Sequence, residues 1–182
     1  FKYAPPTGFL ALCEDNLPTP AIADPGEHFK CVLYTGDGNT RSITGVGFQP
    51  DLVWIKSRNA SLYHLLTDSV RGVNNTLSSN TTDNEAFSTE KVLNSFDNDG
   101  FSLNVDDGSG YFGWNVDGQN MVAWCWKAGG AAVSNSDGSI TSQVSVNQDA
   151  GFSIVSWTSD GTNLTVGHGL NKVPSLIIQK QR

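Results

Sequence analysis

The sequence predicts an all-β fold, an antiparallel β-sandwich of the jelly-roll or concanavalin-like kind that is used as a tandem module. Short runs rich in β-branched and aromatic residues alternate with turn residues, and no long helical period interrupts them. Asp-Gly dipeptides separate many of these runs, and both residues tolerate the positive φ angles of type I′ hairpin turns. The dipeptides begin at Asp37, Asp99, Asp107, Asp117, Asp137 and Asp160.

Eight strands are expected, and two packed sheets accommodate them most simply. They lie at 31–35, 52–56, 62–67, 101–105, 121–127, 139–146, 152–158 and 175–180. The runs at 52–55 and 176–178 are continuously apolar, which indicates central strands that are covered on both faces. The stretch 74–94 is rich in Asn, Ser and Thr, so we expect a long surface loop there, with at most a turn or two of helix at the capping-box pattern of Thr82 and Glu85.

Residues 1–29 differ in composition from the rest of the chain, because they contain five of the seven prolines. Proline cannot donate a hydrogen bond to a sheet and restricts the residue before it. We therefore expect this segment to be an extended linker or the end of an upstream domain.

Two segments of the chain match each other at an offset of 122 to 124 residues: "CVLYTGDGNTRSITGVGFQPDLVWIKSR" and "IVSWTSDGTNLTVGHGLNKVPSLIIQKQR". The same landmarks recur in the same order, namely an aromatic residue, an Asp-Gly turn, a Gly-x-Gly pair, a proline and a final arginine. The pattern predicts a β-sandwich module at 30–150 and the start of a second, truncated copy at 151–182. A segment of this size cannot bury a core of its own, so we expect it to pack against another part of the chain or against another molecule.

Six motifs carry a resemblance to a known family: "YTGDGNTRSITGVGFQPDLVWIKSR", "LLTDSVRG", "LNSFDNDGFSL", "MVAWCWKAGG", "VSNSDGSITSQVSVNQDAGFSIVSW" and "VGHGL". Together they resemble an uncharacterised β-rich module that is repeated in virion structural proteins of marine tailed phages, among them cyanophages and pelagiphages. The opening stretch "FKYAPPTGFLALCEDNLPTP" is similar to the end of a SPRY or concanavalin-like domain. The resemblance implies a component of a phage particle and implies no reaction.

The composition excludes several classes of partner. A net charge of -7 without a cluster of Lys and Arg predicts no binding of nucleic acid. No apolar run reaches the roughly 20 residues of a membrane-spanning helix, so we expect no membrane insertion. The spacing of Cys13, Cys31 and Cys125 fits neither a disulfide framework nor a metal motif, and we expect three buried thiols.

The richest group of aromatic residues supplies the candidate ligand-binding site. Alternation along 121–127 places Trp124 and Trp126 on one face of a strand and Cys125 on the other. With Tyr111 and Trp114 they are the candidate contacts for a glycan or for a partner subunit; the alternative is that they are large core residues.

No catalytic residue, metal site or cofactor is expected. His64, Asp68 and Ser69 are the residue types of a hydrolase triad, but residues so close along one segment rarely converge on a common substrate atom. A turn closed by Asp68 and Arg71 explains them better. The acidic loops at 97–100 and 106–108 offer oxygen ligands for calcium, but turn chemistry accounts for them and they lack EF-hand spacing.

We therefore expect a non-enzymatic structural protein on the surface of the virion, in a tail fibre or another surface fibre, with an adhesive role toward a host surface or glycan. Its expected partners are other virion proteins, further copies of the chain, in a trimer for example, and a host-surface polysaccharide. Two alternatives stay open. One is a capsid decoration or head-fibre protein, and the other is a glycan depolymerase, which needs two carboxylates about 5 to 9 Å apart.

Overall fold

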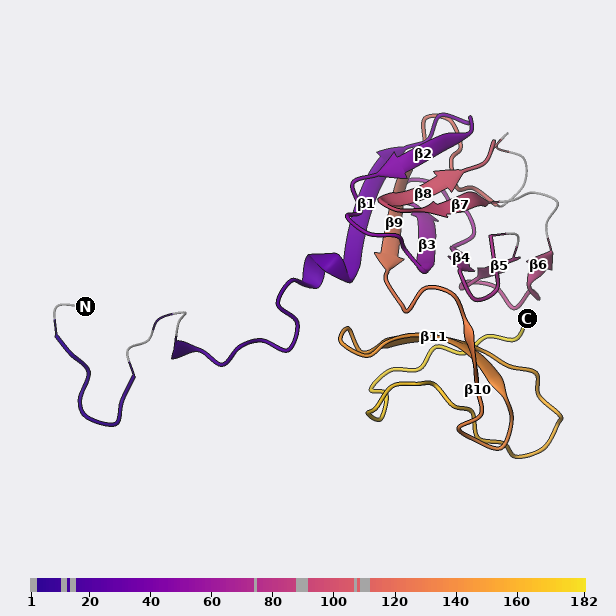
Figure 1. Ribbon diagram of the computed structural model, residues 1–182. Helices are drawn as coiled ribbons and strands as arrows, with labels where there is room; N and C mark the ends of the chain where they lie inside the picture. Colours follow the sequence, from indigo (N-terminus) through magenta and orange to yellow (C-terminus); the bar gives the residue numbers. More distant parts are fainter. Residues whose placement is uncertain are drawn as a thin grey trace.

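The computed structural model describes residues 3–10, 13, 16–73, 75–87, 92–106, 108 and 112–182. Within these residues it contains twelve β-strands and no α-helix, which confirms the all-β prediction. Figure 1 shows a compact β body, a smaller lobe that holds β10 and β11, and an N-terminal segment that extends away from both. A short 3-10 turn, η2 (Pro25–Glu27), leads from this segment into the first strand.

The strands form three antiparallel sheets. The largest has the order β1 (Phe29–Thr35), β9 (Asn120–Trp126), β3 (Leu52–Ser57), β4 (Leu65–Asp68), β5 (Asn75–Ser78) and β6 (Ala86–Phe87). The second has the order β2 (Arg41–Thr44), β8 (Gly100–Leu103) and β7 (Leu93–Asp97). The third has the order β10 (Val133–Asn135), β11 (Ser142–Asn147) and β12 (Phe152–Ser156).

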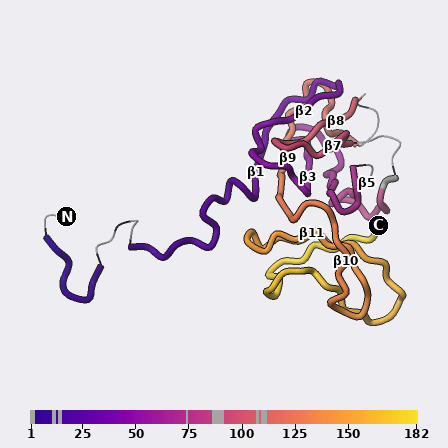
Figure 2. The backbone as a smooth tube through the Cα atoms, in the orientation of Figure 1, coloured from indigo at the N-terminus to yellow at the C-terminus, as the bar shows by residue number. Residues whose placement is uncertain are grey.

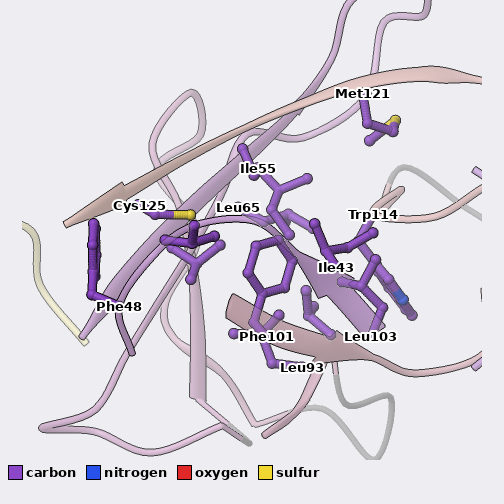
Figure 3. Packing of buried hydrophobic residues seen from close by; sticks show 14 residues of the cluster. Ile43, Phe48, Ile55, Leu65, Leu93, Phe101, Leu103, Trp114, Met121 and Cys125 are labelled. Atoms are coloured by element: carbon purple, nitrogen blue, oxygen red, sulfur yellow. The ribbon is translucent and has the colours of Figure 1, made fainter. Parts of the chain in front are cut away.

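The core lies between the six-stranded sheet and the β2-β8-β7 sheet, so these two sheets form the sandwich (Figure 3). Alternation along each strand decides which side chains enter it. On β3, Val53 and Ile55 point inward, and Phe101 and Leu103 meet them from β8. The remaining buried members include Ile43, Val46, Phe48, Leu65, Val92, Leu93, Trp114, Met121, Ala123 and Cys125.

Four of the strands contain few apolar residues and were not predicted. β2, β5, β7 and β10 are rich in Ser, Thr, Asn and Asp, and 74–94 was expected to be a loop. These strands are stabilised by backbone pairing and by hydroxyl pairs across the sheet, such as Thr67 with Thr76 at 3.0 Å and Ser42 with Ser102 at 2.9 Å. Hydrophobic pattern therefore misses them, and the prediction of a long loop at 74–94 is wrong.

The prediction of a buried strand at 175–180 is also wrong, because these residues form no strand, and Leu176 and Ile177 are 77% and 75% exposed. Strand β3, which the sequence alignment matches to this run, lies between β9 and β4. No segment that the structure describes takes those two places beside 175–180. An apolar run forms a buried strand only where neighbouring strands complete its hydrogen bonds.

The Asp-Gly dipeptides mark turns, but not the predicted type. Within the described residues every positive φ belongs to glycine, so the Asp residues do not adopt the left-handed conformation that a type I′ turn requires. Asp99-Gly100 does join a hairpin, β7 to β8, and Asp137-Gly138 lies in the longer connection between β10 and β11. Asp37-Gly38 and Asp117-Gly118 lie between strands that do not pair with each other, and Asp160-Gly161 follows the last strand, whereas Asp107 lies outside the described residues.

The sandwich ends at Trp126, and residues 128–182 form a second unit, here called the C-terminal lobe. Its sheet spans the boundary expected at residue 151, because β12 pairs with β11. The repeat alignment placed residues 133–147 with the sandwich, whereas the structure places them with β12. Figure 2 shows the end of the chain returning from this lobe toward β5, where the Lys180 ammonium donates to the carbonyl of Thr81 at 2.9 Å.

The three thiols do not share one environment. Cys125 is buried in the core, Cys31 is exposed and Cys13 is intermediate, so the prediction of three buried thiols is wrong. Cys31 and Cys125 lie on neighbouring strands but on opposite faces of the sheet, because alternation reverses the side chain at each residue. Among the described residues, no helix has the length and hydropathy needed to cross a membrane.

Candidate functional site

The six-stranded sheet carries a second apolar surface on the side that faces away from the core. We call it the outer face. Its members come from alternate positions of β1, β3, β4 and β9, and most are half-buried or exposed. They are Phe29, Cys31, Leu33, Leu52, Trp54, Leu66, Val122, Trp124 and Trp126. The run at 52–55 was expected to be covered on both sides, but only Val53 and Ile55 are fully buried.

A row of aromatic rings crosses the outer face. Trp54 lies between Trp124, with ring centroids 5.6 Å apart in an edge-on arrangement, and Trp126, at 6.4 Å in a stacked arrangement. Trp126 is also in contact with Phe29 at 5.0 Å and stacks on Phe152 of the C-terminal lobe at 6.1 Å. Such contacts are the preferred geometries of aromatic pairs and hold the rings in a fixed arrangement.

The two ends of this row differ. Phe29 and Phe152 flank Trp126, so this end of the row joins the sandwich to the C-terminal lobe. At the other end, Trp124 lies beside Cys31 on β1, which is exposed. Leu33, two residues further along the same strand, is 59% exposed. Trp124 is therefore a half-buried tryptophan with an exposed neighbour on β1.

Trp54 occupies the middle of the row. Its indole N–H is buried and has no hydrogen-bond acceptor among the described residues. Leaving a buried donor unpaired costs about 1–3 kcal/mol, and the packing of the neighbouring rings offsets that cost. Trp54 was not among the predicted contacts, because the whole run at 52–55 was expected to be buried. The signal that indicates its position is the alternation along β3, which places Leu52, Trp54 and Lys56 on one face.

A shallow pocket of about 300 Å³ lies beside the outer face. Lys56 reaches it from β3, where it follows Trp54 on the same face of the sheet. His64 comes from the residue before β4, and the register that pairs Ile55 with Leu65 brings it next to Lys56. The remaining lining residues are Ala60, Ser61, Leu62, Tyr63 and Asn80.

The electrostatics of the pocket are set by one ammonium group. Partial burial, together with the positive charge of Lys56, holds the pKa of His64 below its ordinary value of 6.5, so the imidazole is neutral at pH 7. The Lys56 ammonium donates to the carbonyl of Ser57 at 2.8 Å. The pocket thus presents one positive charge, a neutral imidazole and short polar side chains.

The four predicted ligand contacts fall in different places. Trp124 and Trp126 do share one face of β9, opposite the buried Cys125, as the alternation indicated. Trp114 instead lies in the core at 4% exposure, and its indole N–H donates to the carbonyl of Asn104 at 3.1 Å. It cannot contact a ligand at the surface. Tyr111 lies outside the described residues.

The hydrolase-type residues do not form a triad. The Ser69 hydroxyl donates to the Asp51 carboxylate at 2.9 Å, whereas Asp68 forms an ion pair with Arg71 at 2.6 Å. Arg71 also donates to the Glu85 carboxylate at 2.7 Å. This confirms that Asp68 and Arg71 close the turn that follows β4.

In the acidic loops, aspartate carboxylates accept hydrogen bonds from backbone N–H groups of the sandwich. The Asp99 carboxylate accepts the N–H groups of Gly45 and Gly47 at 3.1 and 2.6 Å, which lowers the pKa of that carboxyl below its ordinary value. The Asp106 carboxylate accepts the N–H groups of Trp114 and Asn115, both at 2.8 Å. No group of three or more His, Cys, Asp or Glu side chains within the described chain has a geometry suited to a metal ion.

The fold and the outer face define a β-sandwich domain with an aromatic surface beside a cationic pocket. The family described as domain of unknown function DUF7483 matches residues 24–182, which include the sandwich and the C-terminal lobe. The chain therefore belongs to the DUF7483 family. No curated protein and no solved structure matches it.

Proposed function

We propose that this chain is an adhesive module of a phage surface fibre, and that its outer face binds a host-surface polysaccharide. The observation that carries the proposal is Trp124, a half-buried indole that packs edge-on against Trp54 and lies beside the exposed Cys31. Tryptophan offers a large apolar face to the C–H side of a sugar ring and loses little entropy on binding when its neighbours already fix it. The phage origin rests on the sequence resemblance.

The pocket supports binding rather than cleavage. Glycoside hydrolysis uses two carboxyl groups that face each other across the scissile bond. The residues that line the pocket include no Asp or Glu. Weak binding is sufficient for a fibre, because repeated modules or several copies of a chain raise the effective concentration of each later contact.

The direct test is affinity electrophoresis of the chain through gels that contain bacterial envelope polysaccharides. We expect retardation by at least one polymer and its loss in Trp124→Leu, which keeps apolar bulk but removes the aromatic ring. Trp157→Leu is the matched control, because it makes the same change in the C-terminal lobe. Circular dichroism checks that both variants fold.

Two results would overturn the proposal. One is the absence of retardation in every gel, or retardation that Trp124→Leu leaves unchanged. The other concerns location: immunogold labelling of phage particles that carry the chain should mark a fibre, and label confined to the capsid would remove the fibre assignment.

A further inference from the structure

We propose that the pocket formed by Lys56, Ser61, His64 and Asn80 binds the anionic substituent of an acidic polysaccharide, a carboxylate or a sulfate, while a sugar ring of the same chain stacks on Trp124. This inference rests on the proposed glycan-binding function and adds the chemical class of the glycan. Four features of the pocket carry it.

The first feature is charge. The protein has 18 acidic and 11 basic residues, yet no acidic residue lines this pocket. The ion pairs found among the described residues involve Arg41 and Arg71 and leave Lys56 without a carboxylate partner. A lysine that lines an acid-free pocket on an acidic protein is complementary to an anion.

The second feature is unused hydrogen-bonding capacity. A lysine ammonium has three donors, and Lys56 directs one of them to the carbonyl of Ser57. In the part of the chain that the structure describes, neither the Ser61 hydroxyl nor the His64 ring has a hydrogen-bond partner. The Asn80 side chain uses its oxygen to accept the His64 backbone N–H at 2.8 Å, which leaves its NH₂ group available.

The third feature is spacing. Trp54 and Lys56 are two residues apart on one strand, which corresponds to about 7 Å along the outer face. Trp54 is directly opposite Trp124 in the register of β3 and β9. The pocket is therefore about one sugar residue away from the Trp124 ring, so one polysaccharide chain reaches both.

The fourth feature is rigidity. Lys56 projects from a strand with a paired neighbour on each side. The loop that follows is held by the N–H of Ala60, which donates to the Ser57 hydroxyl at 3.1 Å. The carbonyl of His64 accepts the N–H of Ser79 at 2.9 Å. A site built on such elements loses little entropy when a ligand binds.

The test compares three polymers with different charges in affinity gels: alginate, which carries carboxylates, dextran sulfate, and neutral dextran. We expect retardation by alginate or dextran sulfate to exceed that by dextran and to weaken as salt is added. The polymer that retards the chain more strongly identifies the anion as carboxylate or sulfate. Equal retardation by all three polymers would overturn the inference.

Variants separate the pocket from the aromatic ring. Lys56→Gln should weaken binding to the acidic polymer about tenfold, the effect of losing one charge-assisted hydrogen bond of about 1.5 kcal/mol. Lys30→Gln is the matched control, because it removes the same charge from an exposed position on β1 that alternation places off the outer face. His64→Gln should weaken binding less, because the neutral ring carries no charge.

The outcomes distinguish the two proposals. If Lys56→Gln and Lys30→Gln bind equally well while Trp124→Leu does not bind, the pocket inference fails and the glycan-binding function stands. If Trp124→Leu binds like the wild-type chain, the glycan-binding function itself fails. Loss of acidic-polymer binding in both Lys56→Gln and Trp124→Leu, with Lys30→Gln unaffected, supports both.

Discussion

Arg71 provides the sharpest test of how this sandwich is held together. Its side chain is 6% exposed and donates to two carboxylates, Asp68 at 2.6 Å and Glu85 at 2.7 Å. It also donates to the carbonyl oxygens of Leu66 at 3.1 Å and Asn75 at 3.3 Å. One guanidinium thus ties the turn after β4 to the backbone of β4 and β5 and to the segment that leads into β6.

The perturbation is Arg71→Met, which keeps most of the apolar stem and removes all the N–H donors. It leaves the Asp68 and Glu85 carboxylates without a cation, at side-chain exposures of 6% and 16%. Breaking a buried ion pair by removing one partner costs about 3–5 kcal/mol, mostly because the other charge stays buried and unpaired. We expect the free energy of unfolding to fall by that amount.

The assay is urea unfolding followed by tryptophan fluorescence. With a denaturant slope of about 2 kcal/mol/M, the expected loss lowers the midpoint by about 1.5–2.5 M. Arg41→Met is the matched control, because the Arg41–Asp37 pair is 3.5 Å apart with side chains 32% and 46% exposed. An exposed pair contributes about 1 kcal/mol at most. Equal midpoints for the two variants would refute this account of Arg71.

A third variant isolates the buried charges. Combining Arg71→Met with Asp68→Asn and Glu85→Gln removes the unpaired carboxylates, so part of the lost stability should return. If the triple variant is less stable than Arg71→Met alone, the hydrogen bonds of the carboxylates matter more than their charge.

Three further predictions concern the two faces of the sheet. Burial raises the pKa of the Cys125 thiol to about 12, whereas Cys31 is exposed. In a Cys13→Ser background, iodoacetamide at pH 8 should therefore modify Cys31 and leave Cys125 unreacted until the chain is unfolded. Equal reaction rates of the two thiols would contradict their placement. The pKa of Cys125 is higher in the folded chain than its ordinary value of 9.0. Its contribution to the free energy of unfolding is therefore complete below pH 9 and is lost as the pH rises from 9 to 12. A free energy of unfolding that increases over this range would contradict the burial of this thiol. Phe152→Ala removes the ring that stacks on Trp126 and should lower the local stability of the C-terminal lobe by about 1 kcal/mol. The measurement is amide hydrogen exchange in β12, which should become faster. Unchanged exchange would show that this contact does not stabilise the lobe.

The sequence predicts the fold class well, because alternation and turn residues act locally. The strong strands β1, β3, β4, β8, β9, β11 and β12 all overlap runs chosen from pattern. The hydrophobic pattern does not predict strands such as β5, because their stability comes from cross-strand hydroxyl pairs. The pair of Thr67 and Thr76 is the clearest example. Such a pair is visible only when both strands are placed.

The candidate site was partly predictable. Alternation alone places Trp124 and Trp126 on one face, and the structure agrees. The prediction also included Trp114, because it belongs to the aromatic-rich part of the sequence, but composition does not show whether a residue is buried, and Trp114 lies in the core. Lys56 and His64 were not predicted as a pocket, because the register between β3 and β4 brings them together.

The sequence by itself determined that this protein is all-β, that one strand carries two tryptophans on the same side, and that two segments share the same order of aromatic, turn and proline residues. These properties depend on residue period and turn chemistry, which short stretches of chain already contain. Only the tertiary structure decided that Trp126 packs against Phe152 of the C-terminal lobe while Trp124 packs against Trp54 beside the exposed Cys31. It also decided that an apolar run forms a strand with buried residues at 52–57, whereas the similar run at 175–180 forms no strand. The physical reason is that burial and sheet pairing depend on which neighbours a segment meets, and those neighbours come from distant parts of the chain.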